Sequence, residues 1–397
     1  MPGNTIKIEG TKLLVPDDPI IVYIEGDGIG PYIMKAAMYL WNGVVEKVYD
    51  GRRRIHWKEA KAGEKALKEF GTPLPDETIE AIRYHRIAIK GPLATPVGGG
   101  YRSLNVTMRQ QLDLYACVRP IRWLKGVFSP LKNPEKVDVV IFRENTEDVY
   151  AGIEWPVDSE ETEKLRVFLK EEFGISLRPD TGIGIKPISE HATKRLMRMA
   201  LEYALRNGRK SITIVHKGNI MKYTEGAFLR WCKEVAKEEY GDRVCFEDEG
   251  ICDGKIVIKD RIADDMFQQM LLYPEDYDVL VTPNLNGDYL SDACAAMVGG
   301  VGMVPGANIG DAIALFEPTH GTAPRLKNPE YANPMSLILS GAMMLDYIGW
   351  IEAANAVRRC VEMTVAHGYV TPDLKARMKD VKEVSAFGFV EKALENV

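Results

Sequence analysis

The chain has 397 residues, of which 46% are hydrophobic and 27% are charged, and its formal net charge is −6. This length exceeds what one compact core usually holds, so we expect more than one domain. The mild acidity argues against a nucleic-acid partner, and no apolar run approaches the roughly 18 residues of a membrane span, so no membrane contact is expected. The first residues lack the pattern of a signal peptide, which predicts a cytoplasmic protein.

Strand-like and helix-like segments alternate in chain order. Apolar runs typical of buried strands occur at 19–26, 86–92, 136–144, 210–218 and 275–284. Helical spacing fills the intervals, for example at 189–208, where Ser189 can cap the start and Gly208 can end the helix. This alternation predicts an α/β fold with largely parallel sheets. Residues 151–189 are polar and interrupted, which indicates an insertion or an arm that contacts another subunit.

A glycine-rich turn joins the first of these strands to the helix that follows. Its sequence, EGDGIGP, has glycines at 26, 28 and 30 and a proline at 31. The fingerprint of dinucleotide-binding Rossmann folds requires Gly-x-Gly-x-x-Gly, so the spacing fails. Pro31 suits the first turn of a helix. The segment predicts a tight strand-to-helix turn, and any nucleotide should bind elsewhere.

Six cysteines are present, and none of them forms a Cys-x-x-Cys motif, which argues against a zinc site. Reduced, buried thiols are the expectation for a cytoplasmic protein. Cys245 and Cys252 are close enough in sequence to form a disulfide, and some thermophile cytosols permit one, so a bridge is the alternative for this pair.

Arginines gather near the ends of apolar strands. Arg102, Arg109, Arg119 and Arg122 follow one another between residues 91 and 123, and Arg143 lies near the end of the run VVIFRE. Guanidinium groups bind carboxylates through two hydrogen bonds at a time, and strand ends are where α/β sheets build sites. A lone arginine is usually a surface residue, but this group favours a site for a polyanionic small molecule.

Asp288 and Asp292 lie four residues apart in NLNGDYLSDA, which places both carboxylates on one face of a helix. Like charges at this spacing repel, and most such pairs are simply solvated. A divalent cation held between the two carboxylates would turn the repulsion into attraction. The residues alone leave both interpretations open.

Six segments are specific enough to indicate a family: SLNVTMRQQLDLY, RPIRW, VIFRENTEDVYAGIEW, IVHKGNIMKYTEGAF, NLNGDYLSDA and EPTHGTAP. Together they resemble the prokaryotic-type isocitrate dehydrogenases, which belong with isopropylmalate dehydrogenase to the β-decarboxylating dehydrogenases. The resemblance implies an isocitrate/isopropylmalate dehydrogenase-like α/β fold that is not a Rossmann fold. It also implies a large domain (1–114 and 299–397), a small domain (115–147 and 190–298) and a clasp-like arm (148–189).

The resemblance places isocitrate binding on a set of polar and basic residues, namely Ser103, Asn105, Arg109, Arg119, Arg143 and Asn219. Ser103 and Asn105 decide between substrates, because isopropylmalate dehydrogenases carry apolar residues at these positions. The polar pair would leave an isopropyl group facing unpaired donors, at a cost of about 1 kcal/mol or more each. The pair therefore favours a carboxylate at that end of the substrate.

By the same resemblance, the ligands of Mg²⁺ or Mn²⁺ are Asp264, Asp288 and Asp292, and the catalytic residues are Tyr150 on the acid side and Lys217 on the base side. Asp265 is an adjacent alternative to Asp264. The family's shared active sites imply a homodimer in which the partner subunit supplies Asp264, Lys217 and Asn219. Lys and Tyr ordinarily titrate near pH 10, so we expect neighbouring arginine and metal charges to lower the pKa of both catalytic groups.

The coenzyme is expected on the loop EPTHGTAPRLKNPEYANP. Its contacts by resemblance are Thr95, His320, Gly321, Thr322, Ala323, Arg325 and Asn333. NADP-using members follow GTAP with Lys-Tyr, whereas this chain has Arg325 and Leu326, and Pro372 and Ala376 replace a Tyr and an Arg near the C-terminus. NAD-using relatives carry an Asp at position 325. A cation without that carboxylate favours NADP, with NAD as the alternative.

The predicted function is metal-dependent oxidative decarboxylation of isocitrate to 2-oxoglutarate and CO₂, a step of the tricarboxylic acid cycle, with reduction of NADP. One alternative is a paralogue that acts on homoisocitrate or 3-isopropylmalate. Ser103 and Asn105 argue against 3-isopropylmalate. The other is a non-catalytic regulatory subunit. Such subunits usually lose a metal-binding Asp or a catalytic residue, and this chain retains them all.

Overall fold

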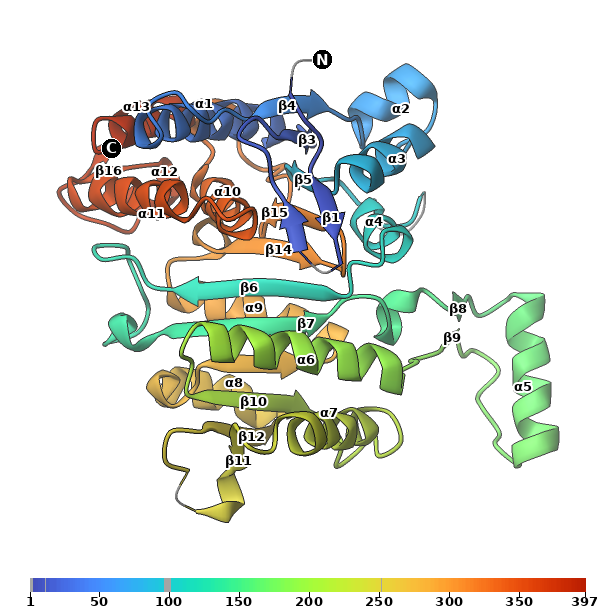
Figure 1. Cartoon of the computed structure of the whole chain (residues 1–397). Coiled ribbons are helices and arrows are strands. Elements are labelled where there is room, and N and C mark those ends of the chain that lie inside the picture. The colour runs from blue at the N-terminus through green and yellow to red at the C-terminus, as the bar shows by residue number, and fades with distance from the viewer. Residues whose placement is uncertain (1–2, 11, 96–100, 251) are drawn as a thin grey trace.

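The computed structural model describes residues 3–10, 12–95, 101–250 and 252–397, and its main feature is one eleven-stranded sheet. The strands of this sheet are β3 (Ile20–Ile24), β4 (His56–Glu59), β5 (Ile87–Lys90), β6 (Ala116–Arg122), β7 (Asp138–Glu144), β10 (Ser211–His216), β11 (Val244–Phe246), β12 (Ile256–Ile262), β13 (Val279–Thr282), β14 (Pro305–Ile309) and β15 (Ala314–Pro318). Their order is β11-β12-β10-β13-β7-β6-β14-β15-β5-β3-β4, and Figure 1 shows the sheet running through the whole body.

The sheet is parallel toward both edges and antiparallel at its centre. The antiparallel pairs are β6 with β7, β6 with β14, and β14 with β15. The α/β prediction is confirmed, and each of the five predicted strands has its counterpart in the sheet. The sequence did not indicate β14, because PGANI carries Pro, Gly and Asn and shows no alternation; its place between two strands makes it extended.

Helices cover both faces of the sheet (Figure 1). They are α1 (Gly30–Val48), α2 (Glu64–Phe70), α3 (Asp76–His85), α4 (Leu104–Gln111), α5 (Glu160–Phe173), α6 (Glu190–Arg206), α7 (Glu225–Tyr240), α8 (Ala263–Leu272), α9 (Asn284–Met297), α10 (Met335–Tyr347), α11 (Ile351–Ala366), α12 (Pro372–Lys375) and α13 (Ala386–Leu394). The predicted cap of α6 is confirmed, since the Ser189 side chain accepts from the Ala192 amide.

Strand β7 shows how the sheet divides the core. Val140 and Phe142 point to one face and pack with α6 and α7, whereas Val139 and Ile141 point to the other face and pack with α8 and α9. This alternation follows from the period of two along a strand. A further core lies among α1, α10, α11 and α13, where buried Trp41 donates to the Ile338 carbonyl at 3.2 Å. The division into a large and a small domain stays a prediction.

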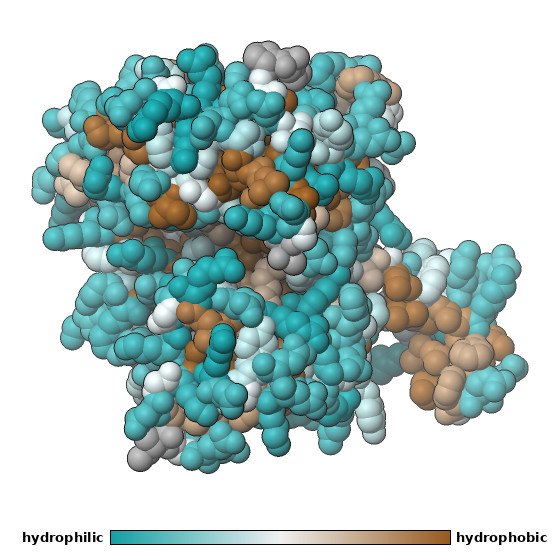
Figure 2. All heavy atoms as spheres, viewed as in Figure 1, coloured by the Kyte–Doolittle hydropathy of each residue, from teal (hydrophilic) through white to brown (hydrophobic). Residues whose placement is uncertain are grey.

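An arm projects from this body (Figure 1). Two short antiparallel strands, β8 (Glu154–Trp155) and β9 (Ile183–Gly184), carry α5 at the end of the arm. Figure 2 shows hydrophobic side chains gathered on the arm, and Phe168 and Phe173 of α5 are 51% and 64% exposed. The arm therefore presents apolar surface that its own chain does not cover.

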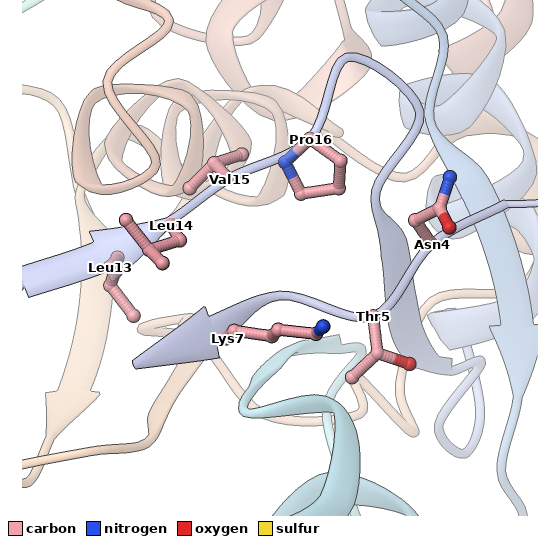
Figure 3. A pocket seen from close by; sticks show the side chains of 7 residues that line it. All are labelled: Asn4, Thr5, Lys7, Leu13, Leu14, Val15 and Pro16. Atoms are coloured by element: carbon pink, nitrogen blue, oxygen red, sulfur yellow. The ribbon is translucent and has the colours of Figure 1, made fainter. Parts of the chain in front are cut away.

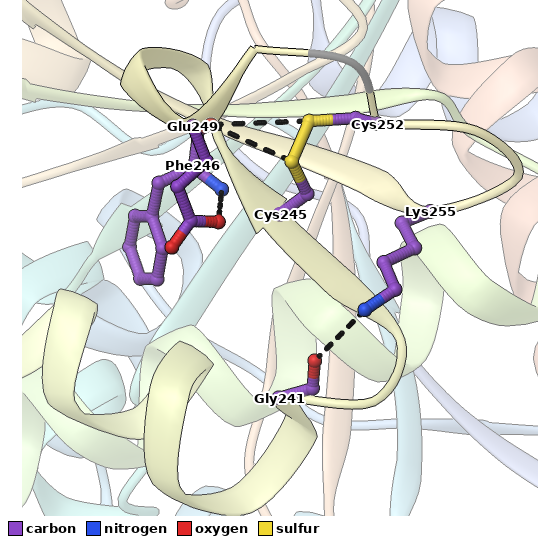
Figure 4. Close-up of a disulfide and its surroundings, with 6 residues drawn as sticks. All are labelled: Gly241, Cys245, Phe246, Glu249, Cys252 and Lys255. Carbon is purple, nitrogen blue, oxygen red and sulfur yellow. Dashed lines mark hydrogen bonds between the residues drawn. A yellow bond between two sulfur atoms is a disulfide. The ribbon is translucent and has the colours of Figure 1, made fainter.

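Cys245 and Cys252 form a disulfide that closes the loop between β11 and β12 (Figure 4). The expectation of reduced thiols is therefore wrong for this pair and the alternative is confirmed. The end of β11 and the return toward β12 bring the two Cα atoms to 5.6 Å, a separation typical of disulfides. The remaining cysteines, at 117, 232, 294 and 360, are free and buried.

A shallow hollow of about 510 Å³ lies beside the N-terminal hairpin of β1 (Lys7–Glu9) and β2 (Lys12–Leu14). Its lining residues are Asn4, Thr5, Lys7, Leu13, Leu14, Val15 and Pro16 (Figure 3). None of them belongs to the predicted active site, so the hollow is a feature of the hairpin.

In the described part of the chain, no helix combines the length and the apolar character needed to cross a membrane.

Candidate active site

Two arginines converge from the antiparallel centre of the sheet. Arg143 of β7 pairs with Cys117 of β6, and Arg119 lies two residues further along β6, so both arginine side chains leave the same face. Arg109 reaches the same region from α4, and the three side chains are each at least nine-tenths buried. Buried guanidinium groups require acceptors, and helix α9 supplies some of them.

Asp288 on α9 is the meeting point of Arg119 and Arg143. Arg143 forms an ion pair with its Oδ1, and the Tyr150 hydroxyl donates to its Oδ2 at 2.6 Å. Arg119 Nη1 lies 3.9 Å from Asp288 and 3.6 Å from Asp292, so it bridges the two carboxylates. The Arg143 guanidinium also lies over the Tyr150 ring, 4.8 Å from its centre. The structure thus brings together five of the predicted site residues.

The charges in this cluster are unbalanced toward the positive side. Burial lowers the pKa of Arg143, and the neighbouring Arg119 lowers it further. Burial alone would raise the pKa of Asp288, but Arg143, Tyr150 and Arg119 together hold it below its ordinary value. Burial raises the pKa of Asp292, and the charge of Asp288 adds to this. A site with this balance favours an anionic ligand.

Several polar atoms of the cluster have no hydrogen-bond partner in the described part of the chain. They are Arg109 Nε, Arg143 Nη2 and Asn105 Oδ1, all of them buried. Buried polar groups are nearly always satisfied, so each exception calls for an explanation. Carboxylate and hydroxyl groups of a bound ligand would supply both the acceptors and the donor that these atoms lack.

Arg109 is held in place by a buried carboxylate that the sequence did not single out. Glu317 of β15 accepts from Arg109 Nη2 at 2.7 Å and pairs with Lys90 Nζ at 2.6 Å. Burial would raise the pKa of Glu317, but Lys90 and Arg109 outweigh it and hold the pKa below its ordinary value. The only signals in the sequence are charged residues within the apolar runs IAIK and ALFEP.

The pKa of the Tyr150 hydroxyl is determined mainly by burial. Burial is the largest influence and raises the pKa of its hydroxyl to about 12, although Arg143 lowers it and the hydrogen bond to Asp288 raises it. Arg143 thus acts in the expected direction, but burial outweighs it and the pKa is raised within this chain. A phenol with this pKa stays protonated near pH 7, which suits a proton donor.

Ser103 and Asn105 lie at the start of α4, where Ser103 is the N-cap residue. The Thr95 hydroxyl donates to Ser103 Oγ at 3.3 Å, which ties the preceding loop to this end of the helix. Arg102 donates instead to the Gly152 carbonyl at 2.9 Å, and Arg122 is exposed, so neither belongs to the arginine cluster.

Lys217, Asn219 and Asp264 form a second group, at the turn after β10 and the start of α8. Lys217 pairs with Asp264, and Asn219 is exposed. His216 is buried; its Nδ1 accepts from the Gly218 amide at 3.0 Å, and its Nε2 lies 3.4 Å from Asp260. Among the described residues, no three His, Cys, Asp or Glu side chains gather so that they could hold a metal ion. Asp264 thus does not join Asp288 and Asp292 within one chain.

The predicted coenzyme loop joins β15 to α10 and packs against the glycine-rich turn. A side chain at Gly28 would meet the Thr322 carbonyl at 2.5 Å, and the Ile29 amide donates to that carbonyl at 3.4 Å. Pro31 lies in the first turn of α1, so the predicted strand-to-helix turn is confirmed. The loop residues Gly321, Ala323 and Arg325 are exposed.

Two polar side chains of this loop, His320 and Asn333, are largely buried. His320 Nε2 is buried without a partner among the described residues, while its Nδ1 lies 2.9 Å from the Gly321 carbonyl. Burial lowers the pKa of His320, so its ring is neutral near pH 7. Asn333 Nδ2 donates to Asp373 at 2.9 Å, and Asn333 Oδ1 accepts from the Met335 amide at 2.9 Å. Asp373 is a further site neighbour that the sequence did not indicate.

The mixed sheet, the arm and the arginine cluster indicate a dehydrogenase. A family model described as isocitrate/isopropylmalate dehydrogenase matches residues 20–392. The chain therefore belongs to the isocitrate/isopropylmalate dehydrogenase family. A protein of Archaeoglobus fulgidus named isocitrate dehydrogenase [NADP] is 56% identical, over 100% of this chain and 97% of that protein. One of Caldococcus noboribetus with the same name is 52% identical, over 98% and 92% respectively.

A solved structure supports the same relationship. The crystal structure of isocitrate dehydrogenase from Methylococcus capsulatus aligns with a TM-score of 0.81 and 40% identity, over 95% of this chain and 99% of that one. These matches confirm the predicted isocitrate/isopropylmalate dehydrogenase-like α/β fold, which is not a Rossmann fold.

Proposed function

We propose that the chain catalyses metal-dependent oxidative decarboxylation of isocitrate to 2-oxoglutarate and CO₂ with reduction of NADP. The observation that carries this proposal is the buried cluster of Arg109, Arg119 and Arg143 around Asp288, in a chain 56% identical along its whole length to an isocitrate dehydrogenase [NADP]. The excess of positive charge suits a tricarboxylate. The unsatisfied atoms of the cluster suit its oxygen atoms.

The substrate is proposed to bind between the arginines and the start of α4. Arg109, Arg119 and Arg143 would bind carboxylates, and Ser103 and Asn105 would meet the carboxylate that distinguishes isocitrate from isopropylmalate. Asn105 would donate to this carboxylate through its Nδ2, whereas its buried Oδ1, which has no partner in the described chain, needs a donor such as a hydroxyl of the ligand. An apolar group placed there would leave Oδ1 unsatisfied. Asn219 would complete the set from the partner subunit.

The metal would be Mg²⁺ or Mn²⁺, held by Asp288 and Asp292 with Asp264 of the partner subunit. Two carboxylates on one helix face, bridged by Arg119, provide the hard oxygen donors that these cations prefer. When bound, the cation would polarise the carbonyl and the enolate as a Lewis acid, and the coenzyme would accept the hydride. Lys217 of the partner subunit would take the proton from the C2 hydroxyl, and Tyr150 would return a proton to the enol.

NADP is proposed to bind on the loop between β15 and α10. Thr95, His320, Gly321, Thr322, Ala323 and Asn333 would contact the adenosine and nicotinamide portions. Arg325, which is exposed, would pair with the 2′-phosphate through its guanidinium group. NAD is the alternative, since the tyrosine that usually follows the cation is replaced by Leu326.

A homodimer with shared sites is proposed because the residues assigned to the partner's site border exposed apolar surface. Ile220 and Tyr223, in the segment after Lys217, are 69% and 93% exposed, and Leu272 at the end of α8 is 59% exposed. Exposed apolar surface of this kind marks interaction sites, and the arm presents more of it. The cytoplasmic location stays a prediction.

An initial-rate assay with D-isocitrate and Mg²⁺ tests the reaction, with NADP and NAD in parallel and EDTA as the control. We expect isocitrate-dependent and metal-dependent formation of reduced coenzyme, with a higher kcat/KM for NADP. Homoisocitrate and 3-isopropylmalate are assayed alongside. Turnover of either of these in place of isocitrate, or folded protein without any turnover, would contradict the proposal and favour the paralogue or the regulatory subunit.

A further inference from the structure

A lysine at the root of the arm joins two buried carboxylates from different parts of the fold. Lys186, between β9 and α6, pairs with Asp148 at the other end of the arm and with Glu225 Oε1, at 2.9 Å, at the start of α7. Asp148 and Glu225 are 1% and 0% exposed, and the Lys186 side chain is 18% exposed. Together these three residues are called the root triad below.

Each carboxylate of the root triad also binds a segment that carries predicted catalytic residues. Glu225 Oε2 accepts from the Lys217 amide at 2.5 Å and from Asn286 Nδ2 of α9 at 2.8 Å. Asp148 Oδ2 accepts from the Leu285 amide at 2.9 Å, in the first turn of α9. The triad therefore connects the Lys217 turn with the helix on which Asp288 and Asp292 lie.

The root triad contains two features that are unfavourable by themselves, a pair of buried carboxylates and a left-handed backbone conformation. Two carboxylates this deeply buried repel each other and lose hydration, unless a cation lies between them. Asp148 also has a φ of 66°, in the left-handed region that few side chains adopt. A network of this kind is rigid while complete, and removing its cation leaves two buried like charges without compensation.

From these contacts we infer that Lys186 and Glu225 are positioning residues for the reaction: they fix the Lys217 turn and the first turn of α9 relative to each other and to the root of the arm. This inference rests on the proposed function. Neither side chain touches the substrate; each acts through the backbone of segments that do. If the site is shared between subunits, the triad links the metal-binding helix of one site to the Lys217 that serves the other.

The test replaces the cation of the triad with an uncharged side chain of similar length. Lys186→Met should lower kcat by about tenfold or more, because small displacements of catalytic groups are costly, while the KM for NADP stays within about twofold. Glu225→Gln is the second variant. The glutamine keeps the size of the side chain but has no charged oxygens for Lys186 and the Lys217 amide. We therefore expect a smaller fall in kcat, again with little change in the KM for NADP.

A matched control exists in Lys194, which also joins two carboxylates and spans α6 and α7. It pairs with Glu190 at 2.6 Å and Glu234 at 3.0 Å, and its side chain is 19% exposed. The contacts of its ammonium group do not include Lys217 or α9. Lys194→Met should leave kcat and the KM for NADP unchanged within about twofold.

Hydrogen exchange provides a readout that does not need turnover. In Lys186→Met and Glu225→Gln, the amides of Lys217 and Leu285 should exchange faster than in the wild-type protein, whereas Lys194→Met should not change them. Folded Lys186→Met and Glu225→Gln with the kcat of Lys194→Met and unchanged exchange at both amides would overturn the inference. A wild-type protein inactive toward isocitrate would overturn the proposed function instead, and the exchange rates would still decide the role of the triad.

Discussion

Asp288 carries the most demanding set of contacts in the candidate site. It pairs with Arg143, accepts from the Tyr150 hydroxyl and lies 3.9 Å from Arg119. Asp288→Asn keeps the shape of the side chain and removes the charge that a divalent cation requires. We expect kcat/KM at limiting Mg²⁺ to fall by about a hundredfold or more, with partial recovery as Mg²⁺ is raised. Near-normal rates at limiting Mg²⁺ would remove Asp288 from the metal site.

Glu317 gives a second prediction at the scale of one residue. Glu317→Gln leaves Lys90 and Arg109 without their buried carboxylate, which should lower the free energy of unfolding near pH 7 by about 3–5 kcal/mol. Because the folded pKa of Glu317 is depressed, its stabilisation is complete above the unfolded pKa of about 4.3 and is lost as the pH falls toward the folded pKa.

Denaturant unfolding of both proteins between pH 7 and acid tests this dependence. The difference in unfolding free energy between wild type and Glu317→Gln should be constant near neutrality and should shrink as the pH is lowered below about 4. A difference that grows on acidification would show that Glu317 does not titrate with a depressed pKa in the folded protein.

At the scale of the element, the loop between β15 and α10 determines the coenzyme in the proposed function. Leu326 follows Arg325 in an exposed stretch, and its amide donates to the Ala323 carbonyl at 3.0 Å, which forms a turn. Leu326→Tyr should add a hydrogen bond to the 2′-phosphate and raise the ratio of kcat/KM for NADP over NAD by about tenfold. Leu326→Phe is the control, since it has the ring without the hydroxyl. Equal ratios in the two variants would place discrimination outside this turn.

The elements also show what the sequence can predict. Asp288 and Asp292 share the face of α9 that their spacing predicts, and the glycine turn and the cap of α6 follow local rules. The pairing of Arg109 with Glu317 spans 208 residues, and that of Lys90 with Glu317 depends on β15 lying beside β5; no local pattern contains either contact. The root triad could not be predicted from the sequence for the same reason. Lys186, Asp148 and Glu225 come from three separate segments and meet only after the arm is folded.

At the scale of the whole molecule, the proposed sharing of sites makes a prediction about mixed dimers. Tyr150 lies beside Asp288, whereas Lys217 pairs with Asp264 in a separate group of the same chain. Tyr150→Phe and Lys217→Met should each inactivate the homodimer. A heterodimer with one variant in each subunit would then contain one site with both original residues and one site with neither. It should recover about half of the wild-type activity, because one of its two sites is intact.

Two different affinity tags and sequential purification isolate the heterodimer, and gel filtration confirms its size. If every site were instead built within one chain, the heterodimer would contain one site without Tyr150 and one without Lys217, and it would stay inactive. The double variant, carrying both substitutions in one chain, provides the control when it is paired with a wild-type subunit. With shared sites that dimer has each site damaged once and should be inactive, whereas with separate sites it should keep about half of the activity. The two pairings therefore give opposite results, and stability effects common to both variants cannot imitate that reversal.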